Sequence, residues 1–180
     1  MSALLPADEP ESERKAEGVL TDYFRAVAAA SVVQAPEQMD GRSLPCAEPP
    51  VFDGVEVKHV DTAVVLAQLI AAIQQVEWEV DLVQKRDVWP TSPIPDPDEP
   101  VAEDDPWVTG PWVSELHHLV RDTLAGVDES EIPTIVARWA QSEDLNWWHV
   151  EELQALAEAL ILLARRAQEI GDQLYCWTSL

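Results

Sequence analysis

The sequence predicts an all-α fold, a helical bundle of three long and two shorter helices with a long acidic Pro-rich loop. Apolar residues recur at steps of three and four along several segments, which is the helical period. No set of segments shows the strict alternation of half-buried strands. We expect a loose N-terminus at 1–10 and a single helical domain at 11–180, with the acidic Pro/Trp loop 87–111 inserted.

The first long helix is predicted over residues 12–34. Ser12 has acids beside it, as a helix N-terminus prefers, and Pro36 ends the pattern. Residues 35–57 are rich in proline and glycine and predict a loop, with at most a short extended piece at 55–60. The apolar face of this helix contains Leu20, Phe24 and Val27.

The second long helix is predicted to begin at Asp61 or Thr62, either of which can cap it, and to end near Lys85 and Arg86. Cations in the last turn suit the helix dipole. The segment is rich in β-branched residues, which lowers helix propensity slightly, but strict alternation is absent. Its repeating apolar positions are Leu66, Leu69, Ile70, Ile73, Val76, Val80 and Val83.

Two further helices are predicted after the proline-rich loop. One begins after Pro111 and ends at Gly126, and a shorter one begins at Ser130 with Pro133 in its first turn, where proline is tolerated. The first carries an apolar stripe, and the second has four large apolar residues at helical spacing. These inward-facing positions are Trp112, Leu116, Leu119, Val120 and Leu124, then Ile132, Ile135, Val136 and Trp139.

The last helix, 145–174, carries an apolar seam of about three heptads. Leucine at both kinds of seam position, with alanine mixed in, favours the central core helix of a bundle. The alternative is a homodimer through helix 145–174. The seam consists of Leu153, Leu156, Leu160, Leu163, Ala167, Ile170 and Leu174.

The net charge of the chain limits the classes of partner that it can bind. Its 34 Asp and Glu residues face 11 Lys and Arg residues, a formal net charge of −23. Such a field repels nucleic acid and anionic membranes and attracts basic surfaces. Direct nucleic-acid binding requires clustered cations, and the chain has only isolated basic pairs. We therefore expect a basic protein partner, no direct nucleic acid and no membrane.

Localisation is predicted to be cytoplasmic. The N-terminus lacks a cationic start with an apolar stretch, and no apolar run approaches the roughly 20 residues of a bilayer span. Neither Cys46 nor Cys176 lies in a CxxC motif, and we expect two free thiols in a reducing compartment.

The acidity is most concentrated in the loop 87–111, and no Lys or Arg lies between Arg86 and Arg121. Tryptophan is a frequent interface anchor. The sequence therefore favours a non-enzymatic acidic protein-binding module, an inhibitor or immunity/DNA-mimic protein that engages a basic, nucleic-acid-binding partner protein. The predicted partner-binding residues are Asp96, Asp98, Glu99, Glu103, Asp104, Asp105 and Trp107.

Two alternatives remain open. The first is a metal-binding helical-bundle enzyme that uses carboxylate and histidine side chains. Glu115 and His118 are spaced ExxH, and His149 and Glu152 are spaced HxxE, which partly resembles the residue pattern of carboxylate-bridged metal sites in helical bundles. The second motif is inverted, so the favoured interpretation contains no metal, no cofactor and no catalytic residue. The other alternative is a dimerising structural or assembly subunit.

Overall fold

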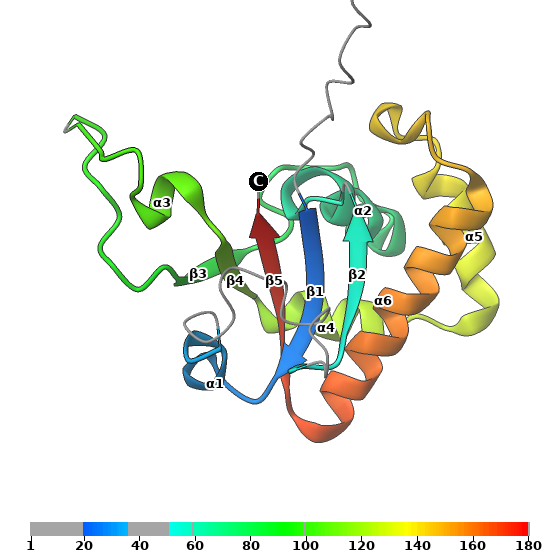
Figure 1. Ribbon diagram of the computed structural model, residues 1–180. Helices are drawn as coiled ribbons and strands as arrows, with labels where there is room; N and C mark the ends of the chain where they lie inside the picture. Colours follow the sequence, from blue (N-terminus) through cyan, green and yellow to red (C-terminus); the bar gives the residue numbers. More distant parts are fainter. Residues whose placement is uncertain (1–19, 36–50, 59, 99, 180) are drawn as a thin grey trace, which may run out of the picture.

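A computed structural model describes residues 20–35, 51–58, 60–98 and 100–179. Within these residues the fold combines a five-stranded antiparallel sheet with helices (Figure 1). The strand order is β2-β1-β5-β4-β3, so the last strand of the chain is the central one and β2 and β3 are the edges. The strands are β1 Leu20–Ala26, β2 Gly54–Lys58, β3 Lys85–Trp89, β4 Trp112–Leu116 and β5 Gln173–Ser179.

The helices lie between and beside these strands. The longest, α6, precedes β5 and ends at Gly171, whose φ of 82° is the left-handed conformation that favours glycine. A π-helical turn, η2, leads into α2. The helical elements are α1 Ala29–Val33, η2 Thr62–Leu66, α2 Ala67–Gln74, α3 Pro106–Thr109, α4 His118–Ala125, η3 Glu129–Glu131, α5 Ile132–Trp139, η4 Glu143–Leu145 and α6 Val150–Ile170.

Apolar side chains cover both faces of the sheet. On one face, Tyr23, Val57 and Cys176 join the main core cluster, which is built with residues of α2, α4, α5 and α6. On the other face, Phe24 and Tyr175 stack with ring centroids 5.5 Å apart and pack with residues that include Val32 of α1. The central strands are therefore buried on both sides.

The all-α, helical-bundle prediction is wrong, and double burial explains why. Strands covered on both faces lose the apolar–polar alternation that would reveal them. In β1 the residues at positions 21–24 are all buried, although they point alternately to opposite faces. In β5, positions 174–177 are likewise all buried. The apolar run of β5 at these positions resembles a piece of helix, and β1 buries the polar Thr21 and Asp22 beside Tyr23 and Phe24, so neither strand shows alternation of apolar and polar residues.

Each long helix predicted before α6 contains a strand instead. Residues 20–26 of the first are β1, which pairs along its length with β5, and among its described residues 20–34 only α1 is helical. The second ends at Gln74, because Gln75 adopts a left-handed φ of 58°. Residues 85–89 then form β3 and residues 112–116 form β4, which pair with each other. Interstrand hydrogen bonding thus overrides the local helical spacing.

Several local predictions are confirmed. The extended piece expected at 55–60 is strand β2. The Asp61 carboxylate accepts a hydrogen bond from the amide of Val64 at 2.7 Å, so Asp61 caps η2. The helix before Gly126 ends there. The inward-facing residues of α5 are buried as expected, namely Ile132, Ile135, Val136 and Trp139. The predictions for residues 1–10 and 12–19 fall outside the described residues.

Candidate functional site

Residues 90–111 form the connection between the edge strand β3 and β4, and we call this segment the acidic arm. Among its described residues, 90–98 and 100–111, the single helical turn is α3. Figure 1 shows the arm extending beyond the sheet on the side away from α5 and α6. The predicted loop 87–111 is thus shortened at its start, because residues 87–89 belong to β3.

Tryptophan and aspartate side chains hold the arm together. The Trp107 indole nitrogen donates to the carbonyl oxygen of Ser92 at 3.0 Å, which ties the two limbs of the arm to each other. The Trp112 indole nitrogen donates to the carbonyl of Trp107 at 3.3 Å. The Asp105 carboxylate caps α3 by accepting from the amide of Trp107 at 2.7 Å. Two predicted contact residues, Asp105 and Trp107, are therefore partly engaged in shaping the arm.

The remaining described acids of the arm face solvent. Asp96, Asp98, Glu103 and Asp104 are exposed, and none of them forms an ion pair with another described residue. The only side-chain hydrogen bond among them is local: the Asp96 carboxylate accepts from the amide of Asp98 at 2.9 Å. Glu99 lies outside the described residues. The arm therefore presents carboxylates that no described side chain neutralises by an ion pair.

The described arginines are all engaged elsewhere in the fold. Arg25, Arg86, Arg121, Arg165 and Arg166 pair with carboxylates of strands, turns and helices at 2.7–3.0 Å. Arg138 donates to the carbonyl of Ala72. These six arginines are thus used for ion pairs and hydrogen bonds within the fold.

Asp53 is the centre of the largest of these networks. Its carboxylate accepts from Arg25 at 2.7 Å and from both Nε and Nη2 of Arg166, at 2.8 and 3.0 Å. Arg25 also pairs with Asp172 at 2.7 Å. The hydrogen bonds from Arg166 and Arg25 lower the pKa of Asp53. This network joins β1, the turn before β2, α6 and the start of β5, so its role is structural.

The residues of the metal alternative do not share a site. Glu115 lies on β4, where it accepts from Tyr175 at 3.1 Å and from Arg86 at 3.0 Å. His118 begins α4, whereas the Glu152 carboxylate accepts from the amide of His149 as part of the N-cap of α6. No group of three or more histidine, cysteine, aspartate or glutamate side chains able to hold a metal occurs among the described residues.

The thiol of Cys176 is buried under the sheet. Burial raises its pKa to about 11, so it remains protonated and unreactive at neutral pH. In the neighbouring strand, the Ser114 hydroxyl donates to the Asp87 carboxylate at 2.6 Å. Cys46 lies outside the described residues. We find no activated nucleophile in this part of the molecule.

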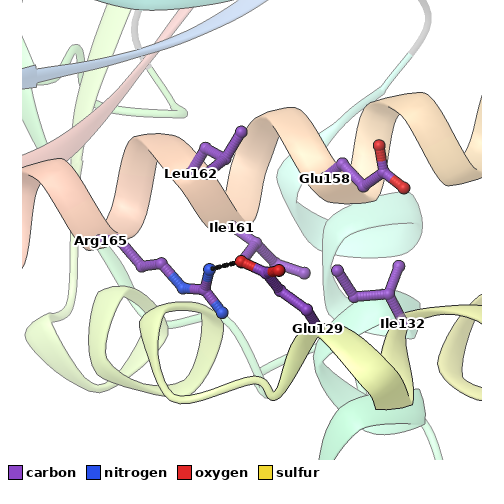
Figure 2. Close-up of a pocket in the computed structure, with 6 residues that line it drawn as sticks. All are labelled: Glu129, Ile132, Glu158, Ile161, Leu162 and Arg165. Carbon is purple, nitrogen blue, oxygen red and sulfur yellow. Dashed lines mark hydrogen bonds and ion pairs between the residues drawn. The ribbon is translucent and has the colours of Figure 1, made fainter.

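A pocket of about 370 Å³ lies between α6 and the η3–α5 turn. Figure 2 shows Ile132 and Ile161 in it together with Arg165 and the carboxylates of Glu129 and Glu158. Arg165 pairs with Glu129 at 2.9 Å and also donates to the carbonyls of Ala125 and Val127. Arg165 and Glu129 thus satisfy each other, and Glu158 accepts a hydrogen bond from Gln154 at 3.0 Å, so we assign the pocket a packing role.

The seam predicted for helix 145–174 is internal to this chain. Helix α6 covers only residues 150–170 of that range, and Leu174 belongs to β5. Most of the seam residues on α6 belong to the main core cluster. The exception is the seam residue Ile170, which is 61% exposed. The buried members are Leu153, Leu156, Leu160, Leu163 and Ala167.

The sequence reasoning overlooked exposed apolar side chains beside the acids of the arm. Ile94 is 70% exposed and Val108 is 47% exposed. The exposure of Ile94 could have been predicted, because it lies between Pro93 and Pro95 and prolines exclude a regular helix or strand that could bury it. The arm therefore combines charge with a few apolar contact points.

Comparison with known proteins identifies no relative. No family model, no curated protein and no solved structure matches this chain. None of the helices in the described part of the chain has both the length and the apolar composition required to cross a bilayer.

Proposed function

We propose that the protein is a non-enzymatic binding module that uses the acidic arm to engage a basic surface on a partner protein. Carboxylates would stand in for the phosphates of a nucleic acid, as in an inhibitor, an immunity protein or a DNA mimic. The observation that carries the proposal is the exposure of Asp96, Asp98, Glu103 and Asp104 without any described ion pair.

Electrostatics supports this function in two ways. A net charge of −23 steers a basic partner towards the molecule, which raises association rates by roughly 10- to 1,000-fold at low salt. The arm then offers a local surface where carboxylates lie near exposed apolar side chains. Such binding weakens steeply with salt, because exposed charges are screened beyond a Debye length of about 8 Å at physiological ionic strength.

The partner belongs to the nucleic-acid-binding class in this proposal, because its basic groove is the natural receptor for an array of anions. The protein would meet it in the cytoplasm. A free, buried Cys176 is compatible with a reducing compartment.

A variant that neutralises the arm tests the proposal. The four substitutions are Asp96→Asn, Asp98→Asn, Glu103→Gln and Asp104→Asn. Partners captured from host extract and released by a salt step are identified, and a purified partner is then titrated with wild type and variant. We expect the variant to bind at least about tenfold more weakly, and duplex DNA to compete with the wild type.

The matched control removes the same charge from the helical side of the molecule. Glu131, Glu143, Glu151 and Glu169 are exposed glutamates on or beside η3, η4 and α6, and each is replaced by glutamine. If both quadruple variants bind equally well, the arm is not the contact surface and only the overall charge matters. If neither variant nor DNA changes binding, the proposed function is wrong.

A further inference from the structure

A second surface lies at the opposite end of strand β3 from the arm. It is a groove of about 340 Å³ lined by residues of α2, of the segment 76–84 and of α4 with its N-cap His117. Its lining includes Ile70 and Val120, which are almost completely buried, and the partly buried Leu82. Leu119 also lines the groove and is 59% exposed, so a large apolar side chain stands in contact with solvent.

The charges around this groove are negative and unpaired. Glu79 and Asp81 line it, are exposed, and form no ion pair with another described residue. No lysine or arginine contributes to its lining. The other polar groups there are the uncharged side chains of Gln74, Gln84 and Thr123, together with His117.

The segment beside the groove repeats this chemistry along its length. Residues 76–81 alternate apolar and acidic side chains, and all of them are exposed. Val76, Trp78 and Val80 are 50, 44 and 63% exposed. Trp78 is held in place because its indole nitrogen donates to the carbonyl of Ala63 at 3.3 Å. Exposed apolar side chains thus lie beside carboxylates that form no described ion pair. Apolar side chains gathered on a surface in this way indicate an interaction site.

We propose that this groove binds a segment of a partner protein in which an apolar side chain is flanked by lysine or arginine. The apolar side chain would cover Leu119 and enter the groove over Ile70 and Val120, and the cations would pair with Glu79 and Asp81. A second copy of this chain is a poor occupant, because it would add another −23 of charge to the same surface. This inference goes beyond the arm, whose binding depends chiefly on charge.

The proposal is tested with two synthetic peptides of equal charge. One is a lysine–leucine peptide, and the other has each leucine replaced by serine. Binding to ¹⁵N-labelled wild type is followed by backbone amide shifts. We expect the leucine peptide to shift amides of residues 70–84 and 117–123, and the serine peptide to act chiefly on amides of residues 92–98 and 100–109.

Single substitutions locate the contact. Leu119→Ser should weaken binding of the leucine peptide about tenfold, because it removes the apolar contact. Glu79→Gln with Asp81→Asn should weaken it further and reduce its salt dependence. Leu162→Ser is the control, since Leu162 is 49% exposed on α6, outside the groove. All these side chains are exposed, so each variant is expected to fold, and circular dichroism is the measurement that checks this.

Three results would overturn the inference. Equal affinity for the two peptides would show that only charge is recognised. Shifts confined to the arm would place binding there and leave the proposed function intact. Unchanged affinity in Leu119→Ser, with Leu162→Ser equally unaffected, would show that the groove is not the receptor. A fourth result would contradict the proposed function alone: the leucine peptide shifts amides of the groove, but the serine peptide shifts no amides of the arm.

Discussion

At the scale of single residues, this protein separates two uses of its acidic side chains. Asp53, Asp122 and Asp172 are paired with arginines within the fold, whereas Asp96 and Asp104 of the arm are exposed and form no ion pair with any residue that the structure describes. The ion pairs of Asp53 and Asp172 connect segments that are distant in the sequence. Unpaired carboxylates add repulsion and remain available to other molecules.

The pairing of Asp53 predicts a pH-dependent contribution to stability. Its pKa is lowered in the folded protein, mainly by the hydrogen bonds from Arg166, so its contribution is present above the unfolded pKa near 4 and is lost as pH falls through the lowered folded value. Asp53→Asn should reduce the unfolding free energy by about 1 kcal/mol at pH 7, a modest value because the carboxylate is partly exposed.

Urea unfolding of wild type and Asp53→Asn between pH 2 and pH 7 measures this effect. The difference between the two should shrink as pH falls below about 4. Asp81→Asn, which removes an unpaired exposed carboxylate, is the control and should show no such change. A difference that stays constant across the pH range would contradict the assigned role of the carboxylate.

At the scale of elements, α6 is the structural centre of the molecule. One side of this helix packs into the main core, and its C-terminus turns directly into the central strand β5. Helix and strand therefore depend on each other, since β5 is held between β1 and β4 and the helix covers one face of the sheet.

Substitutions at two leucines of α6 test which side of the helix packs into the core. Leu160 is 2% exposed and Leu162 is 49% exposed. Leu160→Ala should lower the unfolding free energy by about 2–4 kcal/mol, because it leaves a cavity in the core. Leu162→Ala should cost no more than about 0.5 kcal/mol. Equal effects in urea unfolding, or loss of a dimer in sedimentation of Leu160→Ala, would contradict the internal position of the seam.

The end of α6 depends on the backbone of Gly171. At a φ of 82°, any side chain other than that of glycine is strained, although an added Cβ at this position would meet no atom within 4 Å. Gly171→Ala should therefore destabilise by about 1 kcal/mol through backbone conformation alone. Gly171→Asn should cost less, because asparagine tolerates the left-handed region. Thermal unfolding compares the two variants, and equal stability of Ala and wild type would contradict this reason.

At the scale of the whole molecule, charge and fold oppose each other. The net charge of −23 favours expansion, and the two core clusters on either side of the sheet resist it. The arm and the groove lie at the two ends of the edge strand β3, and both carry exposed carboxylates that form no ion pair with a described residue.

This opposition predicts that salt stabilises the isolated protein. Raising NaCl from 0.01 to 0.3 M shortens the Debye length from about 30 Å to well under 10 Å and screens the repulsion. The urea midpoint should rise with salt, and the rise should be smaller in the arm variant that lacks four charges. A midpoint that falls with salt would show that the internal ion pairs outweigh the repulsion.

Sequence reasoning predicted the local features that depend on a residue and its immediate neighbours. The cap at Asp61, the end at Gly126 and the buried face of α5 follow from spacing and from capping chemistry. The acidic arm also follows from composition, because proline excludes regular helix and the acids are contiguous in sequence. These features need no knowledge of distant segments.

Only the tertiary structure decided the fold class and the arrangement of the surfaces. Residues 20–26 and 173–179 are strands because they pair with each other across the chain, and burial on both faces removed the alternation that would have marked them. The groove likewise exists because α2, the segment 76–84 and α4 meet in space. By itself, the sequence determined where charge and apolar residues occur, and long-range pairing determined which of them face solvent together.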